Sequence, residues 1–175
     1  VLLLAHEDRE ALGAATVRLD CRPSEPVLDP ERSTHAFREI VIARGDLARG
    51  FAAADLVVEG EYRTGRQEHV YVEPQGVIAV PAGGGVTVYG SLQCPYYLHG
   101  ALTRGLGIGA AAARVVQAET GGGFGGKEEF PSVIGLHAAL LARKAQKPVR
   151  MIYDRHEDIA ATTKRHPAIV RHRTG

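Results

Sequence analysis

The stretch that decides the fold is residues 114–130, which read Arg-Val-Val-Gln-Ala-Glu-Thr-Gly-Gly-Gly-Phe-Gly-Gly-Lys-Glu-Glu-Phe. Residues 114–118 are typical of a strand, and a long helix is predicted from about Phe130 to Ala145. Between them lies a glycine loop, residues 121–126, in which every residue but Phe124 is glycine. Glycines let backbone N–H groups approach a ligand closely, and a plain hinge would gain nothing from a buried aromatic ring. The loop is therefore predicted to hold a cofactor, with Phe124 buried.

The pattern on either side of this stretch mixes helices and strands. Further strands are predicted at residues 1–5, 38–43, 56–62, 75–81, 86–92 and 148–153. Further helices are predicted within residues 6–22, at 47–54, with Asp46 as N-cap, at 95–106, and after Asp154, whose spacing to Glu157 is that of a capping box. A glycine turn at residues 82–85 makes two of the strands a β-hairpin. The order indicates an α+β (mixed α/β) fold.

Composition excludes several classes of protein. The 21 basic residues nearly balance the 20 acidic ones and form no stripe, so nucleic acid is not an expected partner. No apolar run is long enough for a membrane span. Cys21 and Cys94 lie far apart, which favours a reducing, cytoplasmic setting. The chain opens on an apolar run without Met, which suggests a fragment of a longer polypeptide.

The glycine loop has two rival interpretations as a nucleotide site. A phosphate-binding P-loop is excluded because Lys127 is followed by Glu128, where that motif needs Ser or Thr. The first, third and sixth residues of 121–126 do spell the GxGxxG dinucleotide fingerprint, and Asp154 ends the next strand, where a ribose-binding acid belongs. Against this, Phe124 is bulky, the acidic residues after the loop would repel phosphate, and Asp154 lies further away than the usual roughly 20 residues. A Rossmann-like nucleotide-binding module stays as the alternative.

Three ordered segments resemble the molybdenum-binding subunit of the xanthine dehydrogenase and aldehyde oxidase family. Residues 121–128 resemble its signature loop, residues 67–74 (Gln-Glu-His-Val-Tyr-Val-Glu-Pro) resemble its Gln-Glu-His segment, and residues 154–158, followed by Arg-His-Pro at 165–167, form the third. The resemblance implies that residues 37–175 begin a molybdopterin-binding domain. Residues 1–22 would then be the tail of a preceding small α/β domain, and the proline-rich residues 23–36 a linker.

The resemblance also implies a chemistry and a set of partners. Such an enzyme hydroxylates a xanthine-like N-heterocycle or an aldehyde with water as the oxygen source. Its cofactor is molybdopterin, in its plain or its cytosine dinucleotide form, and partner subunits or domains carry [2Fe–2S] clusters and FAD. The whole would form a homo-oligomer. Since the family's general-base glutamate lies further downstream, the chain is expected to be catalytically incomplete on its own.

Particular residues carry expected roles through the same resemblance. Gln67 is expected to donate its side-chain amide to the oxo group of the metal, and Gly123, Phe124 and Gly125 to contact the cofactor through their backbone. Glu128 is expected to bind the substrate, or else to be a carboxylate satisfied by the start of the following helix. No residue of the chain is expected to ligate molybdenum directly. His69 is expected to make a structural hydrogen bond.

Overall fold

A computed structural model describes residues 2–175, which divide into two compact units. The first unit comprises residues 2–18 and 68–164, and the second comprises residues 19–67 and 165–175. The glycine loop lies in the first unit. None of the described helices combines the length and the apolar character needed to cross a bilayer.

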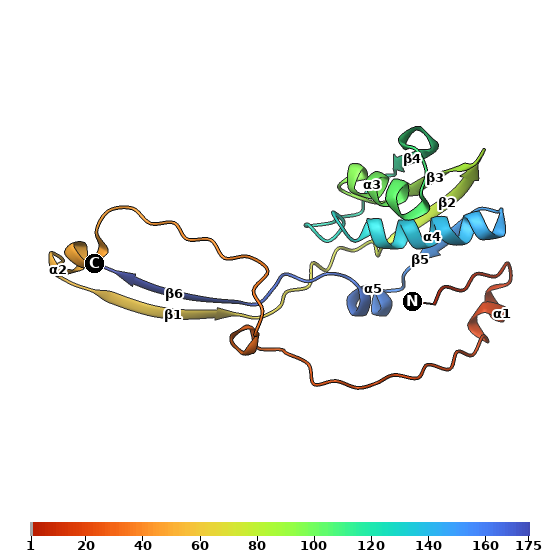
Figure 1. Ribbon diagram of the computed structural model, residues 1–175. Coiled ribbons are helices and arrows are strands. Elements are labelled where there is room, and N and C mark those ends of the chain that lie inside the picture. Colours follow the sequence, from red (N-terminus) through yellow and green to blue (C-terminus); the bar gives the residue numbers. More distant parts are fainter. Residues whose placement is uncertain (1) are drawn as a thin grey trace. The chain divides into compact units, whose positions relative to one another are not determined.

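The first unit is built on a four-stranded sheet in the order β4-β3-β2-β5 (Figure 1). Its strands are β2 (Gly76–Ala82), β3 (Gly85–Gly90), β4 (Ala113–Gln117) and β5 (Val149–Ile152). The hairpin between β2 and β3 is confirmed, and it turns on Gly83 and Gly84, whose φ angles of +51° and +86° favour glycine. Strand β4 pairs parallel to β3, and β5 pairs antiparallel to β2.

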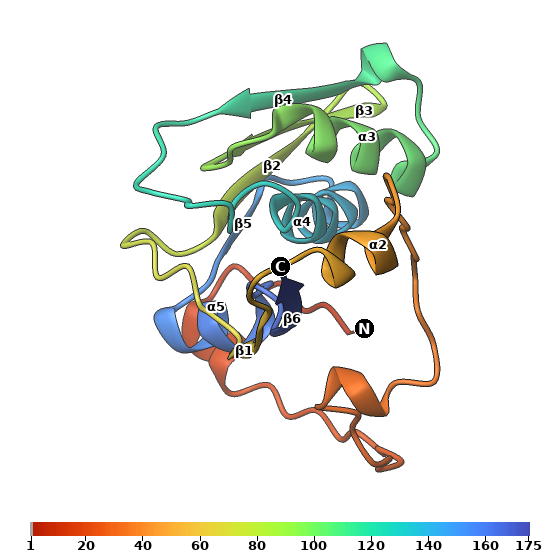
Figure 2. The same cartoon turned by 90° about the vertical axis from the view of Figure 1, so that its left-hand side faces the viewer.

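Two helices cover one face of this sheet (Figure 2). The predicted helices α3 (Pro95–Leu106) and α4 (Pro131–Ala145) are confirmed, and each begins with proline, whose missing N–H costs nothing there. A Cβ at Gly135 of α4 would lie 2.5 Å from Leu98 of α3, so glycine is needed for the helices to pack this closely. The buried core comprises Val77, Ala79, Val86, Val88, Leu92, Leu98, Leu102, Leu106, Ala113, Ile134, Ala138, Ala139 and Ala142.

This topology differs from that of a Rossmann unit. In a Rossmann fold the strands on either side of the phosphate-binding helix belong to an open, mostly parallel sheet. Here β4 and β5, which flank the glycine loop and α4, lie at opposite edges of the sheet with the β2–β3 hairpin between them. Residues 2–175 therefore lack the strand arrangement that the GxGxxG pattern would need.

The remaining elements of the first unit are short. Helix α1 (Arg9–Gly13) ends before the predicted helix did, and a 3-10 turn covers Ala110–Ala112. The capping box at the start of α5 (Arg155–Ala161) is confirmed, since the Asp154 carboxylate accepts from the Glu157 N–H. The strand predicted at residues 1–5 is wrong for residues 2–5, which have no strand partner, while Val1 lies outside the described residues.

The second unit is a two-stranded antiparallel ribbon with short helical segments. Strand β1 (Val58–Thr64) pairs along its whole length with β6 (Ala168–Thr174), a strand that the sequence did not predict. Asp46 caps α2 (Leu47–Ala52) as predicted, and a 3-10 turn covers Pro30–Arg32. The strand predicted at residues 38–43 is wrong, because that apolar run is exposed and pairs with no strand among the described residues.

Candidate functional site

The glycine loop takes a backbone path that needs its glycines. Gly122 and Gly125 have φ angles of +94° and +92°, in the left-handed region that other residues rarely adopt. A Cβ at Gly123 would lie 2.3 Å from the side-chain oxygen of Gln93, and one at Gly126 would lie 2.5 Å from the ring of Tyr71. The loop is therefore packed directly against polar and aromatic side chains and is not a free hinge.

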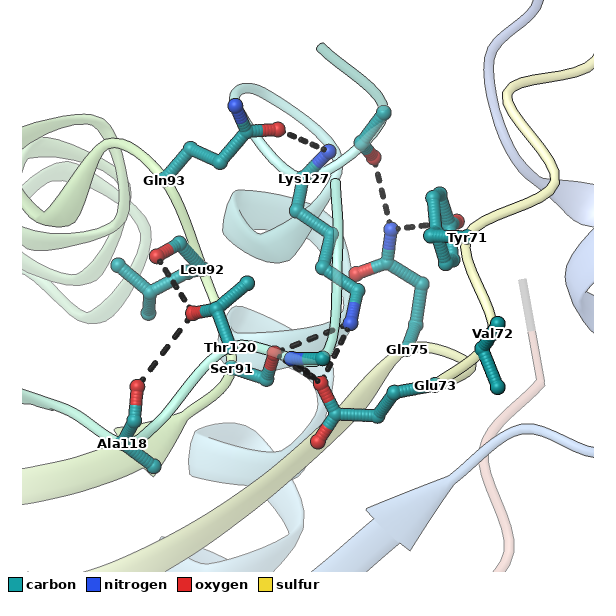
Figure 3. Close-up of polar contacts among 12 residues, drawn as sticks. Tyr71, Val72, Glu73, Gln75, Ser91, Leu92, Gln93, Ala118, Thr120 and Lys127 are labelled. Carbon is teal, nitrogen blue, oxygen red and sulfur yellow. Dashed lines mark hydrogen bonds and ion pairs between the residues drawn. The ribbon is translucent and has the colours of Figure 1, made fainter. Parts of the chain in front are cut away.

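An ion pair with a buried lysine lies against this loop (Figure 3). The fully buried ammonium of Lys127 donates to Glu73 Oε2 at 2.8 Å and to Ser91 Oγ at 3.0 Å. The same Glu73 oxygen accepts from Ser91 Oγ at 2.6 Å and from the Gly121 N–H at 2.7 Å. Burial alone would raise the pKa of Glu73, but these hydrogen bonds and the Lys127 charge outweigh it, so the pKa is lowered.

Two glutamine side chains hold the far end of the loop. Gln93 Oε1 accepts from the N–H groups of Gly125 and Lys127, at 3.1 and 3.2 Å. The buried Gln75 donates from Nε2 to the carbonyl of Gly126, at 2.8 Å, and to the hydroxyl of Tyr71, at 2.9 Å. Glycine has no side chain that could anchor the loop, so these hydrogen bonds hold the backbone of residues 125–127 in place.

A buried carboxylate of α5 completes the network. Asp158 accepts from the Tyr71 hydroxyl at 2.7 Å and from the Gln75 N–H at 2.6 Å. Burial, with the neighbouring Asp158 carboxylate, raises the pKa of Tyr71 to about 12. The ring of Tyr71 in turn lies 4.8 Å from the Lys127 ammonium. The structure thus brings together, within the first unit, side chains from residues 68–74, 121–128 and 154–158.

The three loop residues expected to contact the cofactor differ in what they offer. The N–H of Gly125 already donates to Gln93. Among the described residues, no hydrogen bond takes up the N–H groups of Gly122, Gly123 or Phe124. These three N–H groups have no partner in the described chain; Phe124 is exposed, Gly122 half-buried and Gly123 buried. The expectation of a buried Phe124 is wrong, because its side chain is 75% exposed on a residue with φ +52°.

The acidic residues after the loop do not begin a helix. Glu128 and Glu129 are exposed and precede α4, whose N-cap is Phe130 and whose first turn holds no acidic residue. The alternative that these carboxylates are satisfied in the first turn of the helix is therefore wrong. Glu128 presents a carboxylate to solvent directly beside the glycine loop.

The Gln-Glu-His segment is divided between the two units. Gln67 lies in the second unit, where its backbone forms an isolated bridge to Arg165. His69 lies in the first unit, and its ring packs on Tyr71 with centroids 6.5 Å apart. Its buried Nδ1 has no hydrogen-bond partner within residues 2–175, so the expected structural hydrogen bond is wrong and the ring is held by packing.

Sequence reasoning missed most of the residues that support the loop. Glu73 and Lys127 stand inside motifs that the sequence singled out, yet nothing local shows that the lysine is buried or that the two side chains pair. Asp158 also stands inside a singled-out motif, but nothing local indicates its partners, which are 83 or more residues away. Gln93 lies outside the motifs, and its partner in the loop is 32 residues away.

The fold and the loop together define an α+β cofactor-binding domain. The sequence profile of a family described as "Molybdopterin cofactor-binding domain" matches residues 28–175. The chain therefore belongs to the molybdopterin cofactor-binding domain family, as found in the xanthine dehydrogenases and aldehyde oxidases. The resemblance seen in the three motifs is confirmed, and the Rossmann-like alternative is wrong.

Individual relatives agree with this assignment. The chain is 38% identical to a xanthine dehydrogenase of Dictyostelium discoideum over 143 residues, which cover 81% of this chain and 10% of that protein. It is 34% identical to the nicotinate dehydrogenase large molybdopterin subunit of Eubacterium barkeri, over 97% of this chain and 39% of that subunit. A crystal structure of quinoline 2-oxidoreductase from Pseudomonas putida 86 superposes with a TM-score of 0.61 and 28% identity, over 70% of this chain and 16% of that one. The chain thus spans only a small part of these relatives.

Proposed function

We propose that this chain supplies one wall of the cofactor site of a molybdenum hydroxylase, an oxidoreductase of the xanthine dehydrogenase type. The observation that carries the proposal is the glycine loop, whose ends are hydrogen-bonded by the side chains of Glu73 and Gln93 while the N–H groups of Gly122, Gly123 and Phe124 have no hydrogen-bond partner among the described residues. Fixed backbone donors of this kind suit a bulky anionic cofactor that the protein itself barely ligates.

The residues present fit a molybdopterin. When bound, that group supplies two-electron oxidation with the oxygen taken from water. Gly123 and Phe124 would donate their N–H groups to it, while Gly125, whose own N–H is held by Gln93, would serve by letting the backbone come close. Gln67 would donate its side-chain amide, a role that rests on its sequence segment alone. The cofactor would be the plain or the cytosine dinucleotide form.

The carboxylate beside the loop supports one of the two substrate classes. Glu128 is exposed, and an ionised carboxylate accepts hydrogen bonds only. A xanthine-like N-heterocycle carries ring N–H donors, which an aldehyde group lacks. We therefore favour an N-heterocycle as the substrate and give Glu128 the role of orienting it.

The remaining machinery would lie outside this chain. The general-base glutamate, the [2Fe–2S] clusters and the FAD would belong to other parts of the protein or to partner subunits, in a cytoplasmic homo-oligomer. The lengths of the relatives support this, since the chain covers 10% of the Dictyostelium xanthine dehydrogenase.

The test is hydroxylation of xanthine and of an aldehyde by the full-length protein in ¹⁸O-labelled water. The expected result is ¹⁸O in the product and a Gln67→Ala variant that loses about a hundredfold or more in kcat, as removal of one preorganised donor does elsewhere. Product without label would contradict the proposal, as would a Gln67→Ala loss that is explained entirely by unfolding.

The role of Glu128 has a matched control in its neighbour. Glu128→Ala is expected to lower kcat/KM for xanthine more than for the aldehyde, whereas Glu129→Ala, which removes an equally exposed carboxylate, should change neither. If Glu128→Ala affects both substrates alike, the substrate assignment is wrong.

A further inference from the structure

We infer that the Lys127–Glu73 ion pair is the device that positions the glycine loop, and that the loop depends on the charge of the pair as well as on its packing. The link from the loop to a cofactor rests on the proposed function above, whereas the positioning of the loop does not. Lys127 and Glu73 are therefore positioning residues and act through the backbone N–H groups of the loop.

One oxygen atom joins the two ends of the loop. Glu73 Oε2 accepts from the N–H of Gly121, the first loop residue, and from the ammonium of Lys127, the first residue after the loop. The Glu73 N–H also donates to the Gly121 carbonyl, at 3.3 Å. The Glu73 carboxylate thus bridges Gly121 and Lys127, and the unbonded N–H groups of Gly122, Gly123 and Phe124 lie between these two residues.

The two charges of the pair have different surroundings. The Lys127 side chain is fully buried, while that of Glu73 is 43% exposed. Besides Glu73, the ammonium contacts only the Ser91 hydroxyl and the face of the Tyr71 ring among the described residues. Neither group carries a negative charge, so Glu73 alone neutralises this buried cation.

This difference predicts an unequal response to removing either charge. In Glu73→Gln the ammonium stays buried without a counter-charge, which is the costly case for an ion pair. In Lys127→Met the remaining carboxylate reaches water and still accepts from Gly121 and Ser91. The loop should therefore loosen more in Glu73→Gln than in Lys127→Met, and adding Lys127→Met to Glu73→Gln should restore much of the order.

The experiment measures hydrogen exchange of the full-length protein, peptide by peptide, together with its molybdenum and pterin content. Glu73→Gln is expected to speed exchange in residues 121–128 by about tenfold or more, because a lost charge-assisted bond shifts local opening by at least that factor. Peptides of α4 should keep their wild-type protection. Lys127→Met and the double variant should both lie between wild type and Glu73→Gln, and cofactor content should fall in the same order.

Glu129→Gln is the matched control, since it makes the same chemical change on an exposed residue beside the loop. It should exchange as wild type does. Unchanged loop exchange in Glu73→Gln would overturn the inference, as would equal acceleration across the whole first unit or a Lys127→Met effect as large as that of Glu73→Gln. If Glu73→Gln does not fold, Lys127→Met still decides: its loop should exchange faster than that of wild type while α4 keeps its protection, and loop exchange equal to wild type would overturn the inference. A wild-type protein without molybdenum would overturn the proposed function and leave the loop result standing.

Discussion

Removing the buried carboxylate of Asp158 should loosen the support of the glycine loop from the side of α5. Asp158 is fully buried and accepts from the Tyr71 hydroxyl and from the Gln75 N–H. In Asp158→Ala both donors stay buried without an acceptor, and each costs about 1–3 kcal/mol. The sum, about 2–6 kcal/mol, is a large share of the roughly 5–15 kcal/mol that stabilises a typical domain.

Native-state hydrogen exchange of the full-length protein reads this loss as the free energy of local opening. Peptides that cover residues 71–75 and α5 should lose most of that 2–6 kcal/mol estimate. His156→Ala, an exposed change in the same helix, should stay within about 0.5 kcal/mol of wild type. Tyr71→Phe combined with Asp158→Ala should cost less than the sum of the two single changes, because they remove the same hydrogen bond. A loss below about 0.5 kcal/mol, or strict additivity, would refute the network.

Three further outcomes follow from the same structure. The pKa of Tyr71 is raised to about 12, so its un-ionised hydroxyl contributes stability below pH 10 that is lost between pH 10 and 12. An ultraviolet titration compared with that of Tyr71→Phe should show this late ionisation. Because the pKa of Glu73 is lowered, its contribution is present above its ordinary value of 4.5 and is lost as the pH falls below it; acid unfolding of Lys127→Met should lack part of this dependence. Gly85→Ala would place a Cβ 2.0 Å from the Ala112 carbonyl and should lower stability by about 1–3 kcal/mol in thermal unfolding, whereas Gly109→Ala, with open space around it, should be tolerated.

The sequence predicted the elements whose signals are local. Helices α3 and α4 begin at prolines, the hairpin turns on consecutive glycines, and the capping box of α5 needs only residues three apart. Elements that depend on distant partners were less predictable. Strand β6 pairs with β1, more than a hundred residues earlier, and residues 38–43 have a strand-like composition but no partner strand in the described chain.

The candidate site shows the same division. The glycine loop and the Gln-Glu-His segment could be recognised as sequence motifs, whereas the side chains that hydrogen-bond the loop could not be predicted. A lysine after a glycine run is ordinarily exposed, and only the fold shows that Lys127 is buried against Glu73. The boundaries at residues 1–22, 23–36 and 37–175 stay predictions, as do the roles of Gln67 and Glu128.

Whether the glycine loop forms part of a molybdenum cofactor site can be decided from the molybdenum and pterin content of the purified full-length protein and of its Gly123→Ala variant. A Cβ at this position would lie 2.3 Å from Gln93 Oε1, so the Gln93 side chain would have to move and release the N–H groups of Gly125 and Lys127 that it holds. The wild type should contain stoichiometric molybdenum and pterin, and a Gly123→Ala protein that keeps its fold should show a marked loss of both. A wild type with neither component, prepared from cells that make the cofactor, or a variant that retains both in full, would contradict this role of the loop.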